Sequence, residues 1–218
     1  YGEGRVLARA FDVTDETAVG AAVDELEERV GPIDVLVNNA GVGLLSALEG
    51  TSQQKIRQIF ETNTFGPMAL IRSVLPQFRE RKSGVIVNVS STVTLKSIPL
   101  ISIYTASKHA LNGFSQSLAL ELQPFNIQVK LVLPGRAPET SFAKNVQQMM
   151  DEFPPAYTDM AHQLLQSLGD SEGPSTESVD VAEAVWQAAT DPSSPSRIPA
   201  GADAVIWAKE AMLSATTA

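Results

Sequence analysis

The sequence contains no cysteine and only two histidines, His109 and His162, in 218 residues. Disulfides and thiolate metal sites are therefore excluded, and a histidine-based metal site or a serine-hydrolase triad has little material. The 16 Lys and Arg residues are outnumbered by 25 Asp and Glu, which gives a formal net charge of −9. Nucleic-acid binding needs clustered basic side chains, so we expect no nucleic-acid partner.

Long apolar runs are also lacking. No stretch is long enough to cross a bilayer, and the start of the chain has no signal-peptide pattern. We therefore expect no membrane partner and a cytoplasmic protein. Apolar residues make up 44% and charged residues 19%, the balance of an ordinary globular protein. The length suits a single domain over residues 1–218.

The chain alternates between strand-like and helix-like segments, which is typical of an α/β domain with a parallel sheet. We expect strands at residues 5–11, 34–37, 84–90, 127–133 and 197–198. Helices are expected at residues 14–30, 51–81, 104–122, 179–190 and 202–213, with two short helical stretches between 136 and 178. The strand at 34–37 is apolar on successive residues, so both of its faces should be covered.

Small polar and glycine-containing groups follow the strand-like segments. They are Asp12-Val13, Asn38-Asn39-Ala40-Gly41, Ser90-Ser91 and Pro134-Gly135. Each group alone is explained as a turn or a strand end. In an open parallel sheet, however, ligands bind beyond the carboxyl ends of the strands. Four such groups at successive strand ends therefore predict a binding crevice.

Tyr104 and Lys108 lie four residues apart, so on a helix they project from one face. A phenol keeps its proton until about pH 10, and a neighbouring ammonium favours the phenolate. We expect Lys108 to lower the pKa of Tyr104 toward neutrality, as an acid/base catalyst requires. Ser91 stands thirteen residues before Tyr104, and we expect its hydroxyl within a few ångströms of the phenol oxygen. The alternative is an exposed pair of no catalytic use.

These groups, in this order and with Asn63 in the 51–81 helix, resemble the short-chain dehydrogenase/reductase family over nearly the whole chain. The resemblance implies a doubly wound, mostly parallel, Rossmann-like sheet. It also implies an oxidoreductase that uses NAD or NADP to interconvert a carbonyl and a secondary alcohol. In such an enzyme Tyr104 is the acid/base, Ser91 binds the reacting oxygen, and Asn63 interrupts its helix and positions a water.

The resemblance further assigns residues to the cofactor. Lys108 would hold the ribose hydroxyls beside Tyr104. The group Asn38-Asn39-Ala40-Gly41 would line the ribose, and Asp12-Val13 would lie beside the adenine. The turn Pro134-Gly135 would pass the nicotinamide. Thr140 stands one place later than the commonest spacing for the residue that contacts the cofactor amide or pyrophosphate.

The family's glycine-rich phosphate turn has no match in the sequence, because Gly2-Glu3-Gly4 precedes a strand and no helix follows it. We expect the chain to begin before the family's third strand, without roughly 50 residues at the usual size of βαβ units. NAD and NADP are then indistinguishable, and the 218-residue chain should bind either one poorly. The segment 5–11 is expected to move beside 34–37 and restore ladder hydrogen bonds; a gap in the sheet is the other possibility.

Two other functional classes stay open at this point. One is a non-catalytic binding or scaffold protein, or an inactive fragment, with the same fold. The other is a lyase or epimerase, which usually carries a larger substrate domain. We also expect a homodimer or homotetramer through the helices that carry Asn63 and Tyr104. Apolar residues of the 104–122 helix cover more of its circumference than one core-facing stripe needs: Ala110, Leu111, Phe114, Leu118, Leu120 and Leu122.

Overall fold

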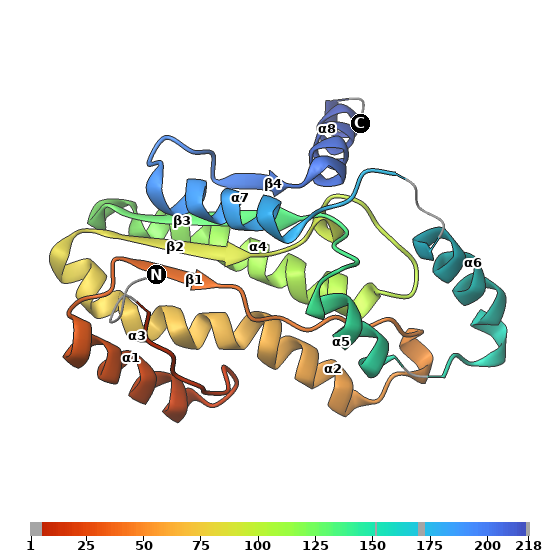
Figure 1. Cartoon of the computed structure of the whole chain (residues 1–218), viewed down its shortest axis with the longest axis horizontal. Coiled ribbons are helices and arrows are strands. Elements are labelled where there is room, and N and C mark those ends of the chain that lie inside the picture. Colours follow the sequence, from red (N-terminus) through yellow and green to blue (C-terminus); the bar gives the residue numbers. More distant parts are fainter. Residues whose placement is uncertain (1–5, 151, 170–172, 217–218) are drawn as a thin grey trace.

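The computed structural model describes residues 6–150, 152–169 and 173–216. Its centre is a four-stranded parallel sheet in the order β1-β2-β3-β4. The strands are β1 (Val35–Asn38), β2 (Gly84–Val89), β3 (Ile127–Pro134) and β4 (Arg197–Ala200). All four carboxyl ends point the same way (Figure 1). The expected α/β class with a parallel sheet is therefore confirmed.

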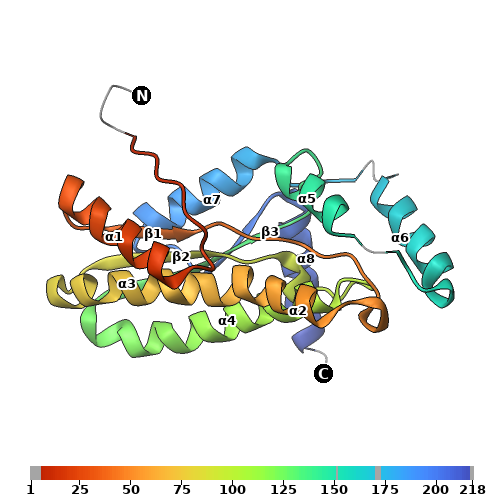
Figure 2. The same ribbon diagram turned by 90° about the horizontal axis from the view of Figure 1, so that it is seen from below.

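Helices cover both faces of the sheet (Figure 2). On one face lie α3 (Gly66–Arg81) and α4 (Ser102–Leu122), with α1 (Glu16–Val30) packed against α3. On the other face lies α7 (Ser178–Thr190). Beyond the carboxyl ends of the strands are α2 (Gln53–Phe60), α5 (Ser141–Met149) and α6 (Thr158–Gly169), and α8 (Ala202–Thr216) follows β4.

Each face of the sheet buries its own apolar cluster. Between the sheet and α3 and α4, the cluster is centred on Phe78, Ile86 and Leu118. On the α7 side, Val87 and Val132 pack against Ala184 and other small residues. Successive residues of β2 thus serve opposite cores, which explains why this strand is apolar on both faces apart from Asn88. The two cores hold the strand ends, and hence the crevice, in a fixed arrangement.

The expected strand at 5–11 is wrong. Arg5 lies outside the described residues, and residues 6–12 have no regular secondary structure. Val6 is 67% exposed, and in the described part of the chain β1 pairs with β2 alone. The predicted displacement of this segment onto β1 is therefore also wrong. An apolar pattern favours a strand only where a neighbour offers a ladder, and none reaches this segment.

The long helical pattern at 51–81 is divided into three parts. After α2, residues Glu61–Phe65 form one π-helical turn, and α3 then continues to Arg81. Asn63 lies inside the π turn and is fully buried. Such wide turns are frequent at functional sites. The prediction that the helix is interrupted at Asn63 is confirmed.

Candidate active site

Tyr104 and Lys108 lie on one face of α4, and both are buried. The Lys108 Nζ is 5.9 Å from the centre of the Tyr104 ring and donates a hydrogen bond of 3.0 Å to the carbonyl of Val89, the last residue of β2. Ser91, two residues beyond that strand end, lies beside the Tyr104 phenol, where its side chain favours the ionised phenol. The expected convergence of these three side chains is therefore present in the structure.

The predicted lowering of the Tyr104 pKa is wrong for the protein by itself. Burial raises the pKa of Tyr104 to about 12, and the side chain of Ser91 opposes this only in part. Burial also lowers the pKa of Lys108 to about 8. Removal from water disfavours the charged form of each group. The sequence indicates that the ammonium lies near the phenol, where it would lower the phenol pKa. Burial raises the same pKa, and in this structure the effect of burial is the larger one.

Ser90, the other serine of the pair, makes different contacts from those of Ser91. Its backbone N–H donates to the carbonyl of Val132 on β3. Its hydroxyl is buried and has no hydrogen-bond partner among the described residues. The Ser91 hydroxyl, by contrast, also accepts a bond from the N–H of Val93. The geometry thus favours Ser91 over Ser90 as the side chain that meets the phenol.

Asn63 joins the π turn to two other parts of the crevice. Its amide side chain exchanges two hydrogen bonds with the backbone of Val42, at 2.9 and 2.8 Å, and donates a third to the Ser107 hydroxyl at 3.0 Å. Ser107 in turn donates to the carbonyl of Tyr104. Asn63 therefore fixes the backbone that follows β1 against the catalytic segment of α4.

A second buried polar chain was not found from the sequence. Asn38 at the end of β1 donates to Asn88 of β2 at 2.8 Å, and Asn88 donates to Ser115 of α4 at 2.8 Å. The three side chains are almost fully buried. They tie two strand ends to the helix that carries Tyr104. A lone asparagine inside an apolar strand was the available signal, because a buried amide needs partners.

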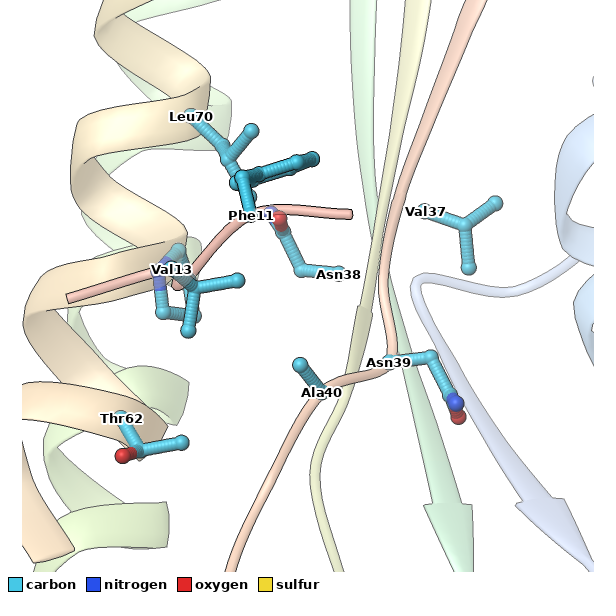
Figure 3. A pocket seen from close by; sticks show the side chains of 9 residues that line it. Phe11, Val13, Val37, Asn38, Asn39, Ala40, Thr62 and Leu70 are labelled. Carbon is cyan, nitrogen blue, oxygen red and sulfur yellow. The ribbon is translucent and has the colours of Figure 1, made fainter. Parts of the chain in front are cut away.

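Some of the residues assigned to the adenine and ribose, Val13 and Asn38-Asn39-Ala40, border a cleft of about 200 Å³ at the end of β1. It is lined by Phe11 and Val13 on one side, by Pro67 and Leu70 of α3, and by residues 37–40. Figure 3 shows Ala40 on the α3 side of the chain and Asn39 pointing the opposite way. Asp12 is exposed, and its carboxylate accepts two bonds from Thr14 instead of facing the cleft.

Pro134-Gly135 ends β3, and Thr140 follows at the N-cap of α5. The Thr140 hydroxyl donates to the carbonyl of Ala137 at 2.8 Å, so it closes a local turn. The structure thus brings Ser91, Tyr104, Lys108 and Asn63 into one connected cluster. It leaves Asp12 and Thr140 engaged with their own neighbours in the chain.

The wall opposite α4 is apolar. The ring of Phe142 on α5 lies 5.8 Å from the ring of Tyr104. Gly43 lies under α5, where a Cβ would come within 2.8 Å of Phe142 and 2.5 Å of Val146. Behind them Leu45, Leu100 and Ala161 form a buried cluster with side chains of the segment 153–164. An apolar group placed beside Tyr104 would therefore contact the apolar side chains of this wall.

The comparisons with known proteins agree with this geometry. The chain matches the family described as short chain dehydrogenase over residues 2–151. An uncharacterized oxidoreductase of Schizosaccharomyces pombe is 34% identical over 202 residues, which cover 93% of this chain and 84% of that protein. The 3-ketodihydrosphingosine reductase of Bacteroides thetaiotaomicron is 38% identical over 165 residues, 76% of this chain and 60% of that protein. Bovine retinol dehydrogenase 8 is 37% identical over 175 residues, 80% of this chain and 49% of that protein.

Solved structures extend the likeness to the whole fold. A short-chain dehydrogenase from Streptomyces avermitilis has 34% identity and a TM-score of 0.84 over 98% of this chain and 77% of its own. A Burkholderia cenocepacia enzyme in complex with NADP has 25% identity and a TM-score of 0.72, over 94% of this chain and 73% of its own. The chain belongs to the short-chain dehydrogenase family. It is an NAD(P)-dependent oxidoreductase of the α/β class.

The described residues fit the ribose of such a cofactor, whereas no cradle for its phosphates is described among them. Lys108 uses one donor on Val89, and the bare Cα of Gly41 leaves space beside its Nζ, where a Cβ would lie at 3.4 Å. Ammonium donors at such a point suit ribose hydroxyls. In the described part of the chain, no strand leads through a glycine-rich turn into a helix, so no phosphate cradle of that kind is described.

Among the same residues, no helix is long and apolar enough to cross a membrane.

Proposed function

We propose that this protein interconverts a carbonyl and a secondary alcohol, with Tyr104 as the acid/base and Ser91 as the group that holds the reacting oxygen. The observation that carries the proposal is the buried contact of Ser91 with the Tyr104 phenol, one helical turn from Lys108. A buried cluster of a phenol, a hydroxyl and an ammonium has the composition that proton transfer to a carbonyl oxygen requires.

Each side chain has a distinct task in the proposed reduction. The bound nicotinamide cofactor supplies the hydride, and Tyr104 gives its phenol proton to the oxygen that becomes the hydroxyl. Ser91 donates a hydrogen bond to that oxygen and keeps it beside the phenol. The Lys108 ammonium stabilises the phenolate left behind. In oxidation of the alcohol the proton returns to Tyr104.

Asn63 is proposed to hold a water that connects Lys108 to the solvent. Both of its N–H donors are used, by Val42 and Ser107, while its Oδ1 accepts one bond, from the N–H of Val42. The Oδ1 therefore keeps a lone pair for a water. A Cβ at Gly41 would lie within 3.4 Å of both this oxygen and the Lys108 Nζ, so the two groups border the same space.

The substrate class is proposed to be apolar. The crevice wall formed by Phe142, Val146 and Leu100 offers hydrocarbon surface next to the phenol. Among the relatives, the named substrates of the 3-ketodihydrosphingosine reductase and the retinol dehydrogenase both join a reactive oxygen to a long hydrocarbon part. A long-chain or cyclic ketone, or the corresponding alcohol, is the class that we infer for this protein.

The test follows reduced-cofactor absorbance with the full-length protein, NADH and NADPH, and ketones of increasing chain length. We expect carbonyl-dependent oxidation whose kcat/KM rises with chain length. Ser91→Ala should lower kcat about 100-fold, within the usual range for such groups. Ser90→Ala is the matched control and should retain wild-type turnover. Equal losses in the two variants, or no turnover of any ketone or alcohol, would contradict the proposal.

We further infer a cytoplasmic homo-oligomer, although fewer exposed apolar side chains support the oligomer than the sequence suggested. The expected apolar surplus on α4 is largely core: Leu111, Leu118 and Leu122 are buried. Leu120 is 68% exposed, and Phe65, the last residue of the π turn and the N-cap of α3, is 50% exposed. These two side chains support pairing through α3 and α4. Light scattering should show a dimer or tetramer that Leu120→Glu dissociates; a wild-type monomer at micromolar concentration would contradict it.

A further inference from the structure

A buried carboxylate at the start of α8 lies against the turn that follows β3. Asp203 is 6% exposed, and its Oδ2 accepts a hydrogen bond of 2.6 Å from the backbone N–H of Arg136. Its Oδ1 lies 2.7 Å from the hydroxyl of Thr176, which is 3% exposed. Asp203 and Thr176 are far apart in the sequence, yet both lie against the turn after β3.

Thr176 completes the attachment from the loop that precedes α7. Its hydroxyl accepts a bond of 3.1 Å from the N–H of Gly135, and its backbone N–H donates to the carbonyl of Arg136 at 2.9 Å. The same hydroxyl lies 2.9 Å from the carbonyl of Ala200 at the end of β4. Two successive N–H groups of the turn, at residues 135 and 136, are thus held by two side chains, and the N–H of Gly135 also donates to the carbonyl of Ala200 at 3.2 Å.

The close approach leaves no space for larger residues. A Cβ on Gly135 would lie 2.2 Å from Asp203 Oδ1, and one on Gly201 would lie 2.0 Å from the Thr176 hydroxyl. Gly201 also has a φ of +99°, which L side chains rarely adopt. Two glycines, a buried threonine and a buried aspartate therefore form one unit, here called the clasp (Gly135, Thr176, Gly201 and Asp203).

We propose that Asp203 and Thr176 are positioning residues that fix the backbone of the Pro134-Gly135-Arg136 turn and, through it, the nicotinamide end of the cofactor. The proposal rests on the proposed function, because that turn borders the nicotinamide only if the crevice binds the cofactor. It assigns a role to one residue in the loop before α7 and to one residue beyond the last strand, both outside every group that the sequence singled out. Neither residue takes part in proton transfer.

Asp203 also lies in the first turn of α8, where a negative charge stabilises a helix. If Asp203 only stabilised α8, it would act through that charge. A positioning role acts through the two acceptor oxygens, and an asparagine can keep both contacts. Its Oδ1 accepts from the N–H of Arg136, and its amide donates to Thr176, whose hydroxyl then donates to Ala200. Asp203→Asn and Asp203→Ala therefore separate the two roles.

The first readout is amide hydrogen exchange at Gly135 and Arg136 in the full-length protein without cofactor. Asp203→Ala should speed exchange at Arg136 by about tenfold or more, because that amide loses the Asp203 acceptor. Thr176→Val should speed exchange at Gly135 by a smaller factor, because the carbonyl of Ala200 still accepts from that amide. Asp203→Asn and Thr176→Ser should exchange like the wild type. Exchange unchanged in both disruptive variants, or equal in the asparagine and alanine variants, would overturn the proposal whatever the protein catalyses.

The second readout is cofactor affinity, measured by fluorescence titration with NADH and NADPH. We expect Kd to rise about tenfold in Asp203→Ala and in Thr176→Val, with the KM for the ketone unchanged. Faster exchange with wild-type cofactor affinity would overturn the positioning role. If Asp203→Ala does not fold, the Thr176→Val and Thr176→Ser pair gives the same two readouts. Failure of the proposed function is seen separately, as turnover that survives the loss of the Tyr104 phenol.

Discussion

α4 and α5 both border Tyr104, but they are attached to the rest of the protein in different ways. Nine residues of α4 are buried, and polar ones among them bond to β2 and to the π turn. α5 has no buried residue and reaches the crevice through half-buried apolar side chains such as Phe142 and Val146. One side of the crevice is held by several buried directional bonds. The other is held by apolar contacts and by one hydrogen bond of 3.0 Å from the Lys55 ammonium to the carbonyl of Met149.

The two sides of the crevice suit two different requirements of catalysis, which are proton transfer and the admission of substrate. Proton transfer needs the phenol, the serine and the lysine at fixed positions, which buried hydrogen-bond networks provide. Admission of an apolar substrate needs a wall that opens at low cost, which a helix with few buried contacts provides. A substitution on the α4 side should therefore change kcat and stability, and one under α5 should change KM.

The largest effect is expected from Lys108→Met. Turnover should fall at least 100-fold, because the phenolate loses its cation. At neutral pH the free energy of unfolding should rise by on the order of 2 kcal/mol, because a charge is no longer buried. Lys130, also buried and with a pKa lowered by burial, lies on β3 and bonds to the carbonyl of Ser194. Lys130→Met is the matched control and should keep wild-type turnover.

The same variant should lose a pH dependence of stability. The pKa of Lys108 is about 8 when folded and about 10.4 when unfolded, so between these values the unfolded state binds more protons. The wild-type free energy of unfolding should therefore rise from pH 8 toward pH 10. Above pH 10 the raised pKa of Tyr104 acts in the opposite direction. Urea melts that show the same rise in Lys108→Met would contradict the assignment to this lysine.

Asn63→Ala should have the next largest effect, this time by weakening the α4 side. Removing the amide leaves the N–H and C=O of Val42 without this partner and takes one bond from the Ser107 hydroxyl, which keeps its bond to the carbonyl of Tyr104. We expect a loss of about 3 kcal/mol in unfolding free energy and a lower kcat. Asn112→Ala is the control, since the buried Oδ1 of Asn112 has no hydrogen-bond partner among the described residues. Equal losses in both variants would show that the network adds nothing beyond packing.

The smallest effect on stability is expected from Gly43→Ala, under α5. The added methyl meets only the side chains of Val146 and Phe142, so α5 can move outward. We expect less than about 1 kcal/mol of destabilisation, a KM for long-chain ketones raised several-fold, and kcat within about twofold. Gly20→Ala on α1 is the control, because its Cβ meets nothing within 4 Å. A fall in kcat with unchanged KM would end the distinction between the two sides.

The sequence predicted well what short-range patterns determine. The apolar periodicity predicted α4 and α7 to within two residues, and the family resemblance implied an interruption at Asn63, where the structure has the π turn. The spacing of Ser91, Tyr104 and Lys108 predicted their convergence, because strand end and helix are joined by a short connection. The strand at 5–11 failed because β structure depends on a neighbour, which no local pattern reveals.

What the sequence missed is set by tertiary contact. The clasp joins residues from β3, the loop before α7 and the start of α8, and no motif links Thr176 with Asp203. The Asn38–Asn88–Ser115 chain crosses three elements in the same way. The pKa of Tyr104 was predicted with the wrong sign because burial, which the sequence does not fix, outweighs the neighbouring ammonium. Sequence reasoning found the reacting groups and missed what holds them.

The central claim is that the buried phenol of Tyr104 carries the proton. The most direct measurement compares Tyr104→Phe with the wild type in carbonyl-dependent oxidation of the reduced cofactor, together with cofactor affinity by fluorescence titration. Phenylalanine keeps the ring contact with Phe142 and removes only the hydroxyl. The account predicts that turnover falls by about 1,000-fold or more while the cofactor Kd stays within about twofold. Turnover of Tyr104→Phe at the wild-type rate would contradict it.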